Sequence, residues 1–394
     1  MISLTFRRAV ATDFDLPQYS CILLIAMMGA SVTILMPLLV GAFTDSGLFS
    51  TTQVGYLASA EIAGILISSA SAYLWVRRIP WRSWTQLSLL AFIACNLATS
   101  WIVTYELVVL LRFVAGLACG VSYAIALAAL GDQSRVDKAF GVMVTIQVIF
   151  GTAGFALLPY VIIRFGYAGI YQCFNLFLVL AFVLSFISFP TNQKPQKTFR
   201  IDLHGRWLAA GLVFAGTIAY YFAQGTVWAY LERIGVNAGL SVAEVGAILG
   251  VGFAISAIGS MLSSWFVSHI GRNRSLMITA AVQLPCLAAL YWLSNSHAWL
   301  VYAIATIVYQ IFWSFIVPIM MAIFNDVDKS GRLIVFCVTA FKIGLVLGPP
   351  AAAFTIGIAS LNEVLWLGAV AIVISVVCLM ASNRLLQRES SSSK

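Results

Sequence analysis

The amino-acid sequence predicts an all-α membrane protein whose 12 transmembrane helices form two pseudo-symmetric six-helix bundles. The first observation behind this prediction is composition: the 394 residues are 61% hydrophobic and only 9% charged, against roughly 25% charged residues in soluble domains. The second is that most apolar runs are 20 to 27 residues long, which suits the ~20 helical residues that cross a bilayer. The third is an internal repeat that relates the two halves of the chain.

Apolar runs interrupted by charged residues, proline and turn residues define the expected spans. The first six lie near residues 20 to 43, 52 to 76, 83 to 104, 106 to 130, 139 to 163 and 167 to 189, and the last six near 207 to 231, 242 to 268, 275 to 294, 298 to 324, 333 to 357 and 363 to 383. The expected domain order is an N-terminal segment (1–19), a first bundle (20–189), a linker (190–206), a second bundle (207–384) and a disordered tail (385–394).

Basic residues predict the orientation, because they resist translocation across the membrane. With a cytoplasmic N-terminus, 18 Lys and Arg residues fall inside and only Arg164 and Arg233 fall outside. We therefore expect an integral protein of the plasma membrane, in a bacterium the inner membrane, with both termini cytoplasmic. The same distribution accounts for the net charge of +8 without a nucleic-acid partner. The first apolar run is too long for a secretory signal and is expected to remain in the mature protein.

The sequence offers no set of residues for catalysis. All seven cysteines fall within expected spans without a CxxC or Cys/His cluster, so they are interpreted as packing residues. The three histidines lie in loops or at span ends. No phosphate-binding loop, HExxH helix or nucleophile with an adjacent base is present. We expect no enzyme activity, no cofactor and no metal.

The repeat is clearest at two helix starts. FSTTQVGYL, residues 49–57, matches LSVAEVGAI, residues 240–248, at an offset of 191 residues. Both copies have the spacing of a capping box, in which a Ser side chain and a Gln or Glu three residues later satisfy free amides: Ser50 with Gln53, and Ser241 with Glu244. Pro159 matches Pro350 at the same offset. An even number of spans in each copy predicts parallel repeats about an axis along the membrane normal.

With these features the chain resembles the major facilitator superfamily over nearly its whole length. LLRFVAGLACG, which holds Arg112, is similar to that family's fourth-helix pattern of an Arg followed by spaced glycines. YLWVRRIPWR and WFVSHIGRNR are similar to the loops after the second and eighth helices, although the usual Asp position falls at Arg77 and near Ser268. The resemblance implies a monomeric transporter that works by alternating access.

Glycines spaced by four are expected to bring helices close together, since packing drives helix association in lipid. The pairs are Gly116 with Gly120 and Gly344 with Gly348, the second followed by Pro349. The segment GLVLGPPAAA resembles the Gly-xxx-Gly-Pro pattern of the family's antiporters, but lies on the eleventh span instead of the fifth. Plain close packing and helix sliding between states are the two alternative roles.

Three ionisable residues lie inside expected spans: Glu61, Arg112 and Lys342. An unpaired charge at the bilayer centre costs at least about 2.5 kcal/mol, so each needs a partner or a function. Glu61 and Lys342 fall near the midplane on the second and eleventh spans, which meet across the seam between halves in the family that the chain resembles. We hypothesise that they pair in one state and separate in another, with Arg112 as a rival partner of Glu61. The pair is either a static lock or a proton-coupling device.

Aromatic and amide side chains at three- and four-residue spacing predict the wall of a central cavity. The candidates are Tyr221, Gln224 and Trp228 on the seventh span, Tyr302, Tyr309, Gln310 and Trp313 on the tenth, and Arg112 and Tyr123 on the fourth. The alternative role of Tyr and Trp is anchoring at the membrane surface, which is the expectation for Tyr230.

Such a cavity favours a small aromatic or carboxylate-bearing solute. We expect a proton-coupled secondary transporter of such a solute. A drug or multidrug antiporter of the same fold and a non-transporting receptor or scaffold are the alternatives.

Overall fold

The computed structural model describes residues 15–191, 206–293, 297–327 and 334–392. Within these ranges every regular element is a helix. The helices are α1 (Leu16–Ile34), α2 (Met36–Asp45), α3 (Thr51–Trp75), α4 (Trp81–Thr99), α5 (Tyr105–Leu130), α6 (Val136–Ile187), α7 (Trp207–Asn237), α8 (Val242–Ile270), α9 (Arg272–Tyr291), α10 (Ala298–Val327), α11 (Ile334–Ile358) and α12 (Glu363–Ser392).

The twelve predicted spans are confirmed, although they do not map one to one onto the helices. Together α1 and α2 make the first span. The 52 residues of α6 hold the fifth and sixth, separated at Gly166, whose φ of 61° lies outside helical geometry. A straight helix of that length would measure about 78 Å, more than twice the thickness of a bilayer core. Among the described helices ten are long and apolar enough to cross a membrane, and the less apolar α4 packs beside α5 and α6.

A proline causes the break in the first span. Pro37 has no amide hydrogen, and its ring excludes the carbonyl of the residue four positions earlier, Thr33. The backbone leaves helical geometry at Leu35, with φ −94° and ψ 14°. The carbonyl of Thr33 is therefore available to a partner outside its own helix.

Both predicted capping boxes are present. The Ser50 hydroxyl accepts a hydrogen bond from the Gln53 amide at 3.2 Å, and the Gln53 side chain accepts one from the Ser50 amide at 2.9 Å. Ser241 and Glu244 repeat the arrangement with the same two distances, 3.2 and 2.9 Å. The repeated sequence thus encodes a repeated structure, since each box satisfies amides that a helix start leaves unpaired.

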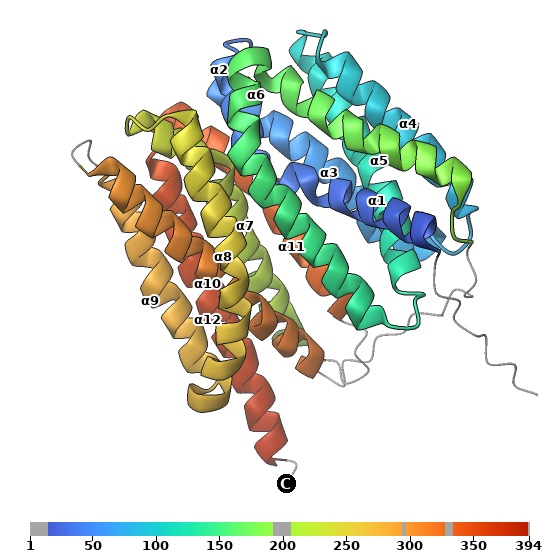
Figure 1. The fold of residues 1–394 in the computed structure, drawn as a ribbon. Helices are drawn as coiled ribbons and strands as arrows, with labels where there is room; N and C mark the ends of the chain where they lie inside the picture. The colour runs from blue at the N-terminus through green and yellow to red at the C-terminus, as the bar shows by residue number, and fades with distance from the viewer. Residues whose placement is uncertain (1–14, 192–205, 294–296, 328–333, 393–394) are drawn as a thin grey trace, which may run out of the picture.

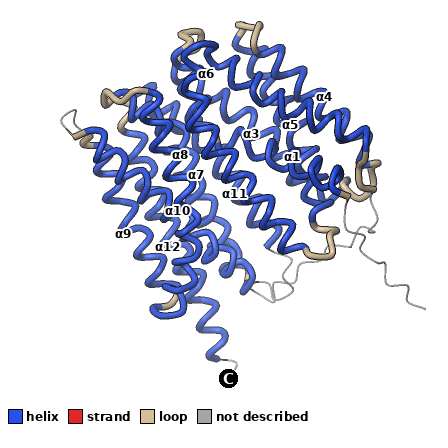
Figure 2. Tube along the Cα trace, in the orientation of Figure 1, coloured by secondary structure: helices blue, strands red, loops and turns tan. Residues whose placement is uncertain are grey.

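The helices form two bundles, α1–α6 and α7–α12 (Figure 1). The main contacts between the bundles are α3 with α11, α6 with α8, and α2 with α7. The bundles lean together at the end that carries α2 and diverge toward the other end (Figure 1). We call the α2 end the outer side, following the orientation expected from the sequence. Described loops are confined to the helix ends (Figure 2).

The spaced glycines pack helices within each bundle. A Cβ added to Gly116 would collide with the backbone of Glu61, and one added to Gly120 would lie 2.9 Å from the Ile65 carbonyl oxygen, so both residues seat α5 on α3. In the second bundle, a Cβ on Gly344 or on Gly348 would lie 2.5 Å from a backbone atom of α7. The geometry shows close packing at both pairs.

Replacing Gly116 by Ala should destabilise the protein, because the added methyl group meets backbone that cannot rotate away. Overpacking of this kind costs ~1–3 kcal/mol. The matched control is Gly141→Ala in α6, where a Cβ meets nothing within 4 Å. Thermal unfolding in detergent measures both: Gly116→Ala should melt at a lower temperature than the native protein, and Gly141→Ala should not. Equal melting temperatures for the two variants would contradict this packing.

Candidate functional site

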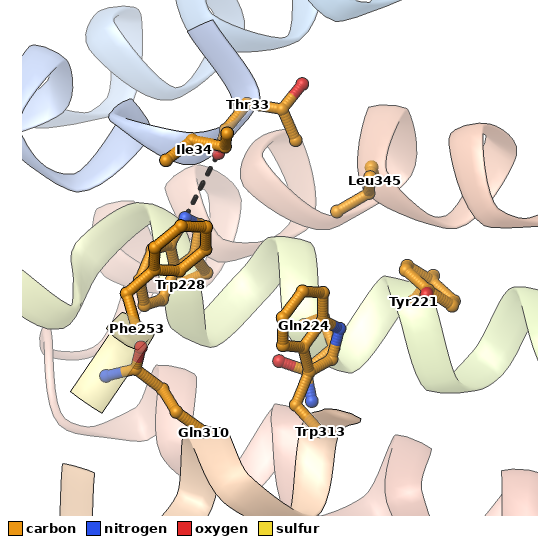
Figure 3. A pocket seen from close by; sticks show the side chains of 9 residues that line it. All are labelled: Thr33, Ile34, Tyr221, Gln224, Trp228, Phe253, Gln310, Trp313 and Leu345. Carbon is orange, nitrogen blue, oxygen red and sulfur yellow. Dashed lines mark hydrogen bonds between the residues drawn. The ribbon is translucent and has the colours of Figure 1, made fainter. Parts of the chain in front are cut away.

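A cavity of about 90 Å³ lies between the two bundles near the middle of the spans (Figure 3). The first bundle contributes two residues at the end of α1, and the second contributes residues from α7, α8, α10 and α11. The lining residues are Thr33, Ile34, Tyr221, Gln224, Trp228, Phe253, Gln310, Trp313 and Leu345. Because its walls belong to both bundles, any movement of one bundle against the other changes the shape of the cavity.

Five of the lining residues were candidates from the sequence: Tyr221, Gln224, Trp228, Gln310 and Trp313. Sequence reasoning missed Thr33, Ile34, Phe253 and Leu345. The signal available for Thr33 was Pro37, four residues later, which marks a break in the first span. Phe253 sits in an apolar run, in which no pattern separates a cavity wall from a lipid-facing surface. Leu345 lies one helix turn from Lys342, which the sequence did single out.

Polar atoms at this cavity lack partners within the described part of the chain. They are the Gln224 side-chain nitrogen, both amide atoms of Gln310 and the Thr33 hydroxyl. Gln224 is 5% exposed and Gln310 is 3% exposed. Buried polar groups are nearly always hydrogen-bonded, and orphaned ones point to a ligand or to water. These groups can therefore bind polar atoms of a solute between aromatic walls.

Trp228 is the outermost of the three α7 residues that line the cavity. Its indole nitrogen donates to the Thr33 carbonyl at 3.1 Å (dashed line in Figure 3), which is the carbonyl released by Pro37. The Trp228 ring meets Phe155 of α6 edge to face, with centroids 5.8 Å apart, and Phe155 also contacts Phe253. The break in the first span thus supplies the acceptor for a bond between the bundles.

The other aromatic candidates lie elsewhere in the packing. Tyr302 is fully buried, and its hydroxyl donates to the Leu231 carbonyl at 2.8 Å. Tyr309 is 1% exposed, and its carbonyl accepts from the Gln283 amide at 3.2 Å. Tyr123 is partly exposed and packs against Gly29 of α1. None of the three lines the central cavity.

Arg112 is buried inside the first bundle, away from the central cavity. Its Nη1 lies 3.4 Å from Glu61 Oε1 and donates to Asn96 Oδ1 at 3.0 Å. The guanidinium stands 4.2 Å from the ring centre of Tyr171, and Asn96 is held in turn by Asn175 at 2.9 Å. Residue spacing could not reveal this cluster, because its members come from four different helices.

A smaller cavity of about 20 Å³ borders Glu61, Arg112 and Tyr171. It is large enough for roughly one water molecule. Arg112 Nε and Nη2 are buried and make no hydrogen bond of normal geometry with a described residue, although Tyr171 lies against the guanidinium. The cluster therefore keeps spare hydrogen-bonding capacity beside its ion pair.

Lys342 lies on α11, one turn toward the inner side from the lining residue Leu345. It is partly exposed and makes no hydrogen bond or ion pair with any described residue. Cys119 of α5 lies within electrostatic reach of both Glu61 and Lys342. In this state the partner of Glu61 is Arg112, the rival that the sequence left open, and Lys342 remains unpaired across the seam.

An ion cluster seals the outer seam. Arg233 of α7 donates to Asp45 of α2 at 2.5 and 2.9 Å, and also to the neighbouring Glu232 at 2.7 Å. Tyr230, for which the sequence favoured a surface anchor, is instead fully buried, and its hydroxyl donates to the Thr51 carbonyl at 3.2 Å. That interpretation was wrong because spacing along one helix does not show that another bundle covers it.

The family model of the Major Facilitator Superfamily matches residues 20–332 and, in a second match, residues 213–393. The chain belongs to this superfamily. It is therefore an integral membrane transporter and not an enzyme, as the sequence predicted.

Solved transporter structures share its fold. The nucleoside transporter NupG superimposes with a TM-score of 0.75 at 14% identity, covering 94% of this chain and 99% of NupG. A D-xylose–proton symporter gives 0.70 at 12% identity, with 92% and 96% covered. An inward-facing, unoccupied bacterial homologue of the human lysosomal transporter Spinster gives 0.68 at 12% identity, with 94% and 97% covered. At these identities the likeness shows the fold alone.

One curated relative is similar in sequence. A probable 3-phenylpropionic acid transporter of Escherichia coli (strain K12) is 28% identical over 147 residues. The match spans 36% of this chain and 37% of that relative.

Replacing Arg112 by Gln should destabilise the protein, because it leaves the Glu61 carboxylate buried beside a neutral group. Breaking a buried pair in this way costs ~3–5 kcal/mol. The double variant Glu61→Gln/Arg112→Gln carries no unpaired charge and should recover much of the loss. Thermal unfolding in detergent measures both, and a double variant no more stable than Arg112→Gln would contradict the electrostatic reason.

Proposed function

We propose that this protein moves a small aromatic carboxylate across the membrane by alternating access, coupled to protons. The observation that carries the proposal is the central cavity, in which unpartnered amides lie between aromatic walls one helix turn from the unpaired Lys342. The walls suit a ring, and the ammonium group suits a carboxylate. The similarity to a probable 3-phenylpropionic acid transporter supports the same substrate class.

The structure supports an inward-facing state with a contracted site. Gly55 of α3 and Gly246 of α8 press against the opposite bundle toward the outer side, where Arg233 also bridges to Asp45. The cavity measures about 90 Å³, whereas pockets for organic ligands measure about 300 Å³ or more. Bound solute therefore needs the bundles to separate further, which couples binding to their movement.

Glu61 is our candidate for the proton site. A buried carboxylate keeps its charge only while a cation compensates it, and here Arg112 does so. A rearrangement that withdraws Arg112 favours protonation of Glu61, and the return of a cation, Arg112 or Lys342, favours release. Proton movement would thereby follow the conformational change.

For the membrane arrangement we propose a monomer in the plasma membrane, in a bacterium the inner membrane, with both termini cytoplasmic. The asymmetric distribution of basic residues supports this orientation.

Uptake of labelled 3-phenylpropionate into proteoliposomes tests the proposed function. An imposed proton gradient should drive accumulation, and a protonophore should collapse it. Extrusion of cationic dyes without uptake of the acid would favour the drug antiporter. Binding of the acid without accumulation under any gradient would favour a receptor.

Glu61→Gln should abolish proton-driven accumulation while leaving exchange of labelled for unlabelled acid, because a side chain that cannot titrate carries no proton. The matched control is Glu106→Gln, the same change at an exposed residue of α5, which should behave like the native protein. Accumulation that persists at native levels in Glu61→Gln would remove Glu61 from the coupling mechanism.

Lys342→Met should raise the KM for 3-phenylpropionate by roughly tenfold or more, since it removes a charge-assisted contact worth ~1.5–3 kcal/mol. Binding of the uncharged amide of the same acid should change little, because it carries no carboxylate. Lys138→Met, at an exposed position of α6, is the control. An equal effect of Lys342→Met on acid and amide would argue against a carboxylate contact.

A further inference from the structure

We infer that the cavity selects substrates with a hydroxyl group on the aromatic ring, bound by the Gln310 amide. This inference rests on the proposed function and narrows its substrate class. It concerns the amide-bearing part of the cavity, not the ammonium group of Lys342.

Gln310 presents a buried amide to the cavity. Its side chain is 3% exposed, and neither amide atom has a partner within the described residues. Whichever way the amide is turned, it therefore presents one donor group and one acceptor. Burying both without a partner is costly, so the position is suited to a polar atom of the ligand.

Gly252 of α8 leaves space for the Gln310 amide. A Cβ at this position would collide with Gln310 Nε2 and lie 3.0 Å from Gln310 Cδ. No other residue type leaves the amide lying against the α8 backbone. The small residue on α8 thus leaves the space that the orphaned amide of α10 occupies.

Gln224 of α7 supplies a second donor. Its side-chain nitrogen is buried and makes no hydrogen bond of normal geometry with a described residue, although the Tyr220 and Tyr309 hydroxyls lie near it. Gln224 lines the same cavity. A hydroxyl group donates one hydrogen bond and accepts up to two. In Figure 3 the Gln310 amide lies beside Phe253 and the Gln224 amide beside Trp313. The ring hydroxyl therefore pairs with Gln310, and Gln224 can bind another polar atom of the ligand.

The aromatic walls place this hydroxyl on the ring. On α7, Gln224 lies one turn from Trp228 on the outer side and three residues from Tyr221 on the inner side, and all three line the cavity (Figure 3). Lys342 lies one turn further inward than Leu345. A ligand that directs its carboxylate to Lys342 therefore presents its ring to the rest of the cavity, where the amides are.

The probes for the test are 3-phenylpropionic acid and its ring-hydroxylated 3-(hydroxyphenyl) analogues, with the hydroxyl at each ring position. The native protein in proteoliposomes should bind one hydroxylated isomer at least about tenfold more tightly than the parent acid, since the parent leaves the Gln310 amide unpaired. Gln310→Met, which keeps the size and removes both polar atoms, should bring that ratio close to one.

Two further variants keep the test decisive. Gly252→Ala displaces the amide without removing it and should also lower the ratio, with the fold intact by gel filtration. Gln86→Met, which alters an amide of α4 outside the lining residues of the cavity, should keep the native ratio.

The outcomes separate the two levels of the proposal. Equal affinity of the native protein for parent and hydroxylated acids overturns this inference and leaves the proposed function standing. A native preference that survives in both Gln310→Met and Gly252→Ala also overturns it. If no acid of the series binds, the proposed function fails and this inference fails with it.

Discussion

Close backbone approach between the two bundles at Gly55 and Gly246 is the constraint on which the rest of the structure depends. A Cβ at Gly55 would lie 2.9 Å from the Pro349 carbonyl oxygen, and one at Gly246 would lie 2.5 Å from that of Phe155 and 2.6 Å from Pro159 Cγ. Both glycines follow a capping box, and they occupy equivalent positions in the repeat. The outer closure is thus built twice, and each copy seats a capped helix on a proline-containing helix of the other bundle.

Closure at these glycines determines where polar groups find partners. It brings Arg233 to Asp45 and Trp228 to the Thr33 carbonyl, both across the seam. It also leaves Lys342 without an ion pair, and the Gln310 amide without a hydrogen bond, among the described residues. In a bilayer such groups are costly unless they are satisfied, so a ligand that satisfies them while the bundles rearrange can use that energy to favour one state over another.

Much of the fold could be read from the sequence, because run length and capping are local properties. The capping boxes at Ser50 and Ser241 and the twelve spans depend only on neighbouring residues. The residues of the candidate site could be predicted from the sequence only in part. Spacing on α7 and α10 correctly selected faces that contain cavity residues, but it could not tell Gln310 at the cavity from Tyr302 within the bundle, since both lie on one helix and only the neighbouring helices distinguish them. The partner of Glu61 required the relative placement of α3, α5 and α11, which no single segment encodes.

A cross-link at the outer seam tests most directly whether the bundles must separate there during transport. The Thr52 hydroxyl lies 3.3 Å from the Ala353 carbonyl across the seam, so cysteines at positions 52 and 353, in a background without the seven native cysteines, should form a disulfide or accept a short bifunctional cross-linker. Cross-linked protein should bind substrate from the inner side yet lose transport, and cleavage of the link should restore it. Unchanged transport by fully cross-linked protein would contradict the account.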